Sequence, residues 1–143
     1  MSKIDSWMFF LLACSFMFGT AFMYPESVGD ENAFLKGFVN HEFLNFMGVI
    51  VTITLASTAN IHIELRKKER EAEEEFLDNT RRSVKQSAFS LIWALFLALV
   101  LVVVKPILPE AEVWQAIANT CSIAIILWGI LVILDITKLA FRM

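Results

Sequence analysis

Cysteine, proline and glycine are scarce in this chain of 143 residues, which has two cysteines, three prolines and five glycines. Cys14 and Cys121 both lie within apolar runs, so the sequence offers no disulfide framework and no metal-ligand spacing. No apolar run contains proline or paired glycines, the residues that often interrupt the spans of transporters. These absences disfavour a disulfide-rich domain, a metal site and a small transporter.

Recognisable catalytic patterns are also missing. The sequence has no nucleophile–base pair at a known spacing, no glycine-rich phosphate loop and no HExxH-type metal motif. Intramembrane catalysis normally needs paired polar groups of suitable chemistry at depth. The deep positions here offer only hydroxyls, one thiol and one amide, from Thr52, Thr54, Ser57, Thr58, Asn119, Thr120, Cys121 and Ser122. We predict that the protein is not an enzyme and that it needs no cofactor or metal.

Charged residues are few, and more than half of them lie in one stretch. Residues 64–85 hold seven acidic and seven basic side chains, while the rest of the chain is largely apolar. Because the two signs are interleaved and balanced there, bulk charge does not favour binding of nucleic acid or lipid by this stretch. We therefore expect no nucleic-acid partner.

Apolar side chains make up 57% of the residues, above the roughly 45–50% of soluble domains. A domain of this size could not bury that fraction in water, so the solvent for most of the chain must be lipid. The apolar runs cover residues 6–24, 43–63, 87–104 and 113–134, and a helix needs about 20 residues to cross a bilayer core. The sequence predicts one all-α transmembrane domain over residues 1–143, in which the first two spans are neighbours, as are the last two.

The distribution of basic residues predicts the orientation of these spans. Ten of the twelve Lys and Arg residues fall on one side, and only Lys36 and Lys105 fall on the other. By the positive-inside rule, both termini and the 64–86 loop face the cytoplasm, which makes the protein a multi-pass inner (plasma) membrane protein. A short surface helix is expected within residues 31–42, on the outer side.

The 64–86 loop is predicted to be a helical hairpin that extends the second and third spans. Its interior lacks Gly and Pro, and oppositely charged residues recur four positions apart. Residues 78–80 have helix-capping side chains, so we place the turn there and let the preceding helix run to about Leu77. This hairpin is either a solvated spacer or a docking surface for a cytosolic protein. The candidate docking residues are Arg66, Lys67, Arg70, Glu71, Glu74, Glu75, Arg81 and Arg82.

The second span is the most polar one, and small residues recur in it at every fourth position. Such a row lets helix backbones approach closely, either within the chain or between subunits. Asn119 on the fourth span should also face protein, and we expect it to meet the second span or a neighbouring subunit. The residues predicted to line a helix interface or a pore are Asn45, Gly48, Thr52, Ala56, Asn60 and Asn119.

Four spans, cytosolic termini and one basic middle loop over residues 66–85 resemble the layout of small bacterial phage-exclusion membrane proteins. These are the Rex-type membrane subunit and the membrane component of Kiwa-type defence. The resemblance lies in span number, chain size and loop position. It implies an oligomeric membrane sensor, or an effector that depolarises the membrane together with a cytosolic partner.

We therefore expect a homo-oligomer in the lipid bilayer, with a tetramer as the working assumption. It would be a bacterial inner-membrane sensor or effector in phage defence that perturbs membrane permeability or recruits a cytosolic partner. The alternative is a non-catalytic accessory subunit of a larger membrane complex, and a small transporter is the second alternative.

Overall fold

A computed structural model describes residues 3–72 and 78–140, and within these two ranges the chain is helical apart from short connections, with no strand. Four helices are long and apolar enough to cross a membrane, with candidate spans Ser6–Met23, His41–Lys67, Arg81–Ile107 and Glu112–Lys138. The predictions of an all-α fold and of four membrane-spanning helices are confirmed. The elements in chain order are α1 (Lys3–Met23), α2 (Pro25–Val28), α3 (Ala33–Phe38), α4 (His41–Ala72), α5 (Asp78–Val104), the 3-10 turn η2 (Lys105–Ile107) and α6 (Glu112–Ala140).

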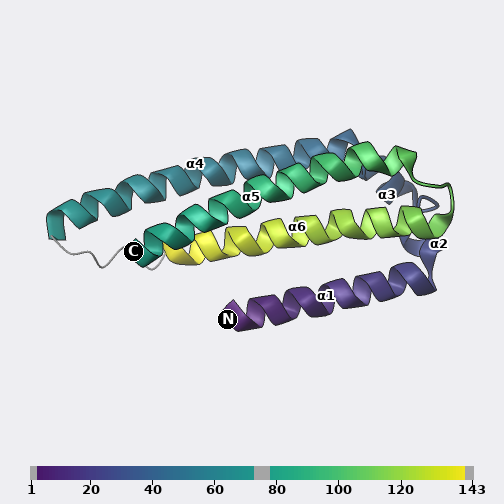
Figure 1. Ribbon diagram of the computed structural model, residues 1–143, viewed down its shortest axis with the longest axis horizontal. Coiled ribbons are helices and arrows are strands. Elements are labelled where there is room, and N and C mark those ends of the chain that lie inside the picture. The colour runs from purple at the N-terminus through teal and green to yellow at the C-terminus, as the bar shows by residue number, and fades with distance from the viewer. Residues whose placement is uncertain (1–2, 73–77, 141–143) are drawn as a thin grey trace.

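The long helices lie side by side in the order α4, α5, α6, α1 (Figure 1). The prediction that the third and fourth spans are neighbours is confirmed, since α5 packs against α6. The prediction that the first and second spans are neighbours is wrong, because α1 packs mainly against α6 and α2 instead of α4. The reason is the connection over residues 24–40, in which α2 packs against α6 and so places α1 on the far side of α6 from α4.

The seam between α4 and α5 follows heptad-like spacing, which is typical of helices that cross at a small angle. On α4 the buried side chains are separated by steps of four and three residues; they are Phe43, Met47, Val51, Thr54, Thr58, Ile61 and Leu65. The facing positions on α5 include Val84, Leu91, Ala94 and Ala98. These residues form two apolar clusters along the bundle, and Ile136 of α6 completes one of them.

Gly129 marks a place where α6 approaches α4. A Cβ atom built on this buried glycine would meet only the Cε atom of Met47, at 3.9 Å, which is ordinary van der Waals contact. Glycine in a helix is less favourable than alanine by roughly 0.5–1 kcal/mol. We therefore expect Gly129→Ala to raise the free energy of unfolding by up to about 1 kcal/mol, measured by reversible unfolding in mixed micelles. A loss of stability would contradict the free space assigned to this position.

The helix α1 is the most peripheral of the four. Among its described side chains only Ser6 and Ala21 are buried. An aromatic cluster holds it to α6, in which the rings of Trp7, Phe10 and Trp128 meet edge to face at centroid separations of 6.0–6.3 Å. Trp128 also donates a hydrogen bond of 2.8 Å from Nε1 to Oγ of Ser90, so one side chain links α1, α6 and α5.

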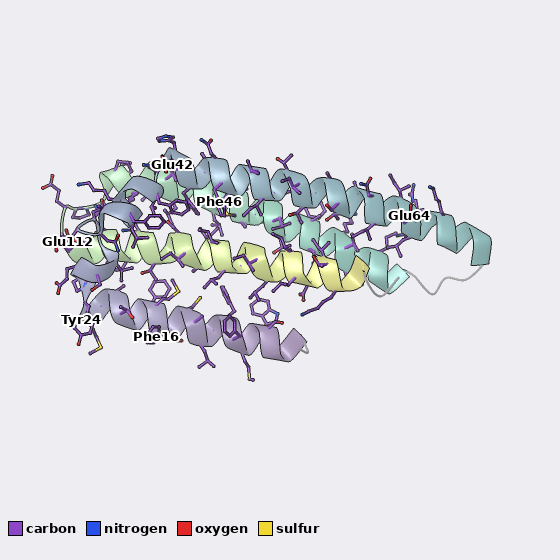
Figure 2. The ribbon with its side chains drawn as sticks, turned by 180° about the vertical axis from the view of Figure 1, so that it is seen from behind. Phe16, Tyr24, Glu42, Phe46, Glu64 and Glu112 are labelled. Atoms are coloured by element: carbon purple, nitrogen blue, oxygen red, sulfur yellow. The ribbon has the colours of Figure 1, made fainter. Side chains whose placement is uncertain are left out.

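Both chain ends lie toward the end of the bundle at which α4 leads into α5 (Figure 1). Figure 2 places Glu64 of α4 toward this end and Glu112 of α6 at the opposite one. The predicted turn at residues 78–80 is wrong, because these residues form the first turn of α5. Asp, Asn and Thr are favourable in the first turn of a helix as well as in its cap, which accounts for the misplacement. The expected end of the preceding helix, near Leu77, lies outside the described residues.

The short helix expected within residues 31–42 is present as α3. The Asn32 side chain caps it by accepting hydrogen bonds from the backbone N–H groups of Phe34 and Leu35, and it also donates to the carbonyl of Ser27. Asn40 joins α3 to α4, since its amide donates to the carbonyl of Gly37 and its Oδ1 accepts from the N–H of Glu42. Two asparagine side chains thus set the path of the chain between α2 and α4.

Candidate functional site

The small-residue row of α4 faces away from the rest of the chain. Asn45, Thr52, Ala56 and Asn60 are exposed, and a Cβ atom built on Gly48 would meet no atom within 4 Å. Packing of this row against another helix of the same chain, one of the two outcomes left open by the sequence, is therefore wrong. The physical reason is that α5 and α6 contact the heptad-spaced positions of α4 instead. A subunit interface or a pore stays the prediction for these residues.

The hydroxyl groups of α4 are satisfied within their own helix. Thr52 donates to the carbonyl of Gly48 at 2.8 Å, and Ser57 donates to that of Ile53 at 3.1 Å. The amides of Asn45 and Asn60, in contrast, make no side-chain hydrogen bond to any residue that the structure describes. An amide that faces hydrocarbon without a partner is costly, so this face favours a polar or protein neighbour.

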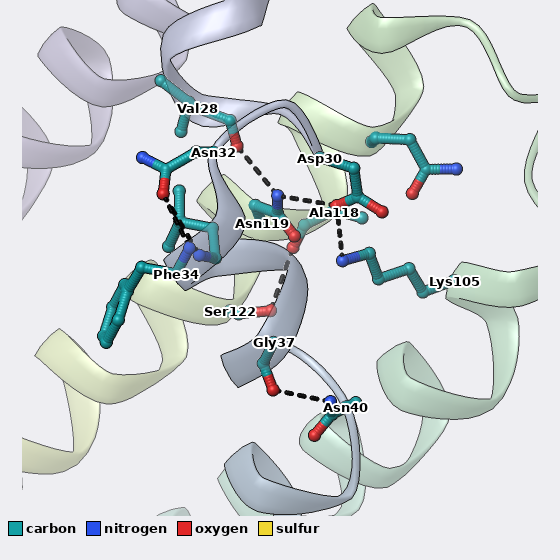
Figure 3. A network of polar contacts seen from close by, with 12 residues as sticks. Val28, Asp30, Asn32, Phe34, Gly37, Asn40, Lys105, Ala118, Asn119 and Ser122 are labelled. Carbon is teal, nitrogen blue, oxygen red and sulfur yellow. Dashed lines mark hydrogen bonds and ion pairs between the residues drawn. The ribbon is translucent and has the colours of Figure 1, made fainter.

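Asn119 lies elsewhere, in a cluster that we call the polar cap (Val28, Asp30, Lys105, Glu112 and Asn119). Its amide donates to the carbonyl of Val28 at 2.8 Å and to Oδ1 of Asp30 at 3.2 Å (Figure 3). The prediction that Asn119 meets the second span or another subunit is wrong, since its amide is bonded to the end of α2 and to the residue Asp30 that follows it, and Asn119 is completely buried. Asn119 therefore fixes this segment onto α6.

The polar cap also contains an ion pair that the sequence analysis did not find. Nζ of Lys105 lies 2.8 Å from Oδ1 of Asp30, and the two side chains are 8% and 25% exposed. Lys105 follows α5 directly, so the pair joins the end of α5 to the connection before α3. Oε2 of Glu112 is buried beside Gly29 and has no hydrogen-bond partner among the described residues. The cap closes the bundle end opposite the chain termini.

A second feature lies between α4 and α5, near the opposite end, and we call it the basic groove. It has a volume of about 660 Å³. Its charged or titratable lining residues are His62 and Arg66 of α4 with Arg81, Arg82 and Lys85 of α5, and its apolar lining residues are Leu55, Ala59, Val84 and Ala88. No carboxylate is among the lining residues that the structure describes. The groove thus brings basic residues of two helices around an apolar floor.

The structure brings together only part of the predicted docking surface. Arg66, Arg81 and Arg82 line the basic groove, and Lys67 is exposed on α4 without lining it. The side chains of Arg70 and Glu71 lie outside the described part of the structure. Glu74 and Glu75 lie outside it as well.

The described chain is a multi-pass helical membrane protein, by the length and composition of its four long helices. No protein family, curated protein or solved structure matches it. Function is therefore inferred from the sequence and from the geometry of the α4 row, the polar cap and the basic groove.

Proposed function

We propose that the protein is a homo-oligomer of the bacterial inner membrane that acts as a sensor or effector, either perturbing membrane permeability or recruiting a cytosolic partner. The observation that supports this proposal best is the outward direction of the small and polar row Gly48, Thr52, Ala56 and Asn60 on α4. Small residues permit close backbone approach, and the Asn60 amide gains a hydrogen-bond partner when a second copy covers this face.

The proposed orientation rests on the distribution of basic residues. In the sequence, ten of the twelve Lys and Arg residues flank the spans on the side of the two termini and the α4–α5 connection. By the positive-inside rule this side faces the cytoplasm, so the helical segments beyond the second and third spans form a cytosolic hairpin. A hairpin on a pore-forming or sensing bundle is a suitable contact for a cytosolic partner. The resemblance to phage-exclusion proteins suggests defence as its setting.

The first test is the oligomeric state after Gly48→Leu. A Cβ atom at position 48 meets no other atom within 4 Å, so we expect the monomer to fold while the close approach of neighbouring α4 helices is blocked. We expect mass photometry of the purified protein to show an oligomer for the wild type, with a tetramer as the working assumption, and mostly monomer for the variant. Gly19→Leu is the matched control, since Gly19 on α1 also has no neighbour within 4 Å, and it should leave the oligomer intact.

Ion flux in liposomes separates the two branches of this proposal. Flux above background that falls with Gly48→Leu supports the permeability branch. Background flux with a stable oligomer supports recruitment, in which case replacing Glu73, Glu74 and Glu75 by alanine should weaken capture of the cytosolic partner. A wild-type protein that is monomeric in several detergents and in nanodiscs would refute the homo-oligomer.

One observation is compatible with the accessory-subunit alternative. The outer face of α1 exposes several phenylalanine side chains, among which Phe16 is 77% exposed and Phe9 and Phe22 are more than half exposed (Figure 2). Such a face suits either lipid or a foreign transmembrane helix. Co-purification of a different membrane subunit in fixed stoichiometry would favour this alternative over self-assembly.

A further inference from the structure

We propose that the basic groove binds the phosphate-bearing headgroup of an anionic phospholipid, with one acyl chain lying along the apolar floor. This proposal concerns a single chain, and it does not depend on assembly through the α4 row. It begins with position, because the groove lies where both helices leave their apolar spans. The apolar runs end at residue 63 in α4 and begin at residue 87 in α5, so Arg66, Arg81 and Arg82 lie just beyond them, next to the lipid headgroups.

The charge of the groove favours an anion. Arg66, Arg82 and Lys85 form no ion pair with any residue that the structure describes, although they surround one groove together with Arg81. Several like charges facing one another repel, and a bound phosphate group relieves this repulsion. Guanidinium groups match phosphate oxygens in a bidentate geometry, and lysine adds a point charge. Basic sites between transmembrane helices on the cytoplasmic side are suited to anionic headgroups.

The apolar floor favours a lipid over a soluble phosphate compound. Ala59 and Leu55 lie about two and three helical turns deeper along α4 than Arg66, and Val84 and Ala88 line the α5 side. Ala59 and Ala88 have small side chains, so the groove stays open over the buried side chains of Thr58 and Val84. An occupant with a charged head and an apolar tail satisfies both parts of this lining at once.

The even balance of acids and bases over residues 64–85 concealed this site in the sequence. In the structure, the basic residues of two helices converge on one groove, whereas Glu64 of α4 is exposed and does not line it. Local convergence of charge, unlike the average over a stretch, decides whether an anion is attracted.

The test measures phospholipid binding to the purified full chain in a neutral detergent. Native mass spectrometry or a fluorescent-lipid titration would use phosphatidylglycerol, phosphatidylcholine and inorganic phosphate as separate probes. We expect saturable binding of phosphatidylglycerol, at least tenfold weaker binding of phosphatidylcholine, and no displacement of the bound lipid by millimolar phosphate. Replacing Arg66, Arg82 and Lys85 together by glutamine should weaken phosphatidylglycerol binding at least tenfold.

The matched control replaces Lys36, Lys67 and Lys138 by glutamine, which removes the same charge at positions that do not line the groove. This control should change the affinity less than twofold. Ala59→Phe tests the floor without changing charge, and it should weaken phosphatidylglycerol binding several-fold while circular dichroism stays unchanged. The proposal would be overturned by equal affinity for phosphatidylglycerol and phosphatidylcholine, or by a loss of affinity in the control as large as that in the glutamine triple variant. It would also be overturned if neither that triple variant nor Ala59→Phe changed phosphatidylglycerol binding. Displacement by inorganic phosphate would overturn the lipid assignment in favour of a simple anion site.

Discussion

Asp30→Ala is expected to lower the free energy of unfolding by about 3 kcal/mol, because it leaves the ammonium group of Lys105 buried without its carboxylate. The Lys105 side chain is only 8% exposed, so water cannot fully replace the lost partner. The same substitution removes the carboxylate that accepts a hydrogen bond from Asn119. Reversible unfolding in mixed micelles, followed by circular dichroism, measures the change.

Two further variants separate the charge from other effects of this substitution. Asp30→Ala combined with Lys105→Met should recover part of the lost stability, since an apolar side chain of similar length replaces the unpaired ammonium group. Asp135→Ala is the matched control, because the Asp135–Lys138 pair is 3.9 Å apart and 41% exposed on both sides. Its expected loss is under about 1 kcal/mol. Equal losses of unfolding free energy for Asp30→Ala and Asp135→Ala would show that the buried Asp30–Lys105 pair contributes no more to stability than an exposed pair.

Gly29→Ala is expected to lower the free energy of unfolding by about 2 kcal/mol, because the added methyl group pushes α2 away from the start of α6. A Cβ atom on Gly29 would overlap the buried carboxylate of Glu112 and would lie 2.7 Å from the carbonyl oxygen of Pro25. That carbonyl also accepts the N–H of Gly29 at 2.6 Å, so it cannot retreat without losing the hydrogen bond that ends α2. The backbone would have to shift instead.

Hydrogen exchange would show where this cost arises. The amides of α2 and of the first turns of α6 should exchange faster in Gly29→Ala, while those of the α4–α5 seam should be unchanged. Gly37→Ala is the control, since a Cβ atom on Gly37 meets no atom within 4 Å. Wild-type exchange and stability in Gly29→Ala would mean that Glu112 can move aside freely.

The four spans could be predicted because each is an apolar run of membrane-crossing length, a property of local sequence alone. The neighbour of α1 could not be predicted in the same way. We assumed that consecutive spans pack together, but the connection over residues 24–40 contains two helices of its own and packs its α2 against α6. The length of that connection was the available signal that α1 need not lie beside α4.

The packing face of α4 could also have been read from the sequence. Its buried residues follow steps of three and four, as expected for a packed seam, whereas Gly48, Thr52 and Ala56 follow steps of four alone. The buried residues in this part of the helix are Val51, Thr54, Thr58, Ile61 and Leu65. Close approach to α4 comes from alanines of its partner helix, Ala94 and Ala98 on α5. The small residues of α4 were therefore left for its outer face.

The polar cap was beyond local sequence reasoning, because its members are far apart in the chain. Lys105 and Asp30 are separated by 75 positions, and Asn119 and Val28 by 91. The one available signal was Lys105 itself, a charge placed directly after an apolar run on the side with few other basic residues. A charge in that position needs a partner, and Asp30 lies on the same side.

The place of α1 at the edge of the bundle has a consequence for biosynthesis. The ribosome makes α1 before the other three spans, yet its packing partner in the bundle, α6, is made after α4 and α5. During translation α1 therefore stays in the bilayer without its packing partner α6, while α4 and α5 can pair as soon as both are inserted. The ring contacts of Trp7 and Phe10 with Trp128 can then form only after α6 has been made, as the step that attaches α1 to the bundle.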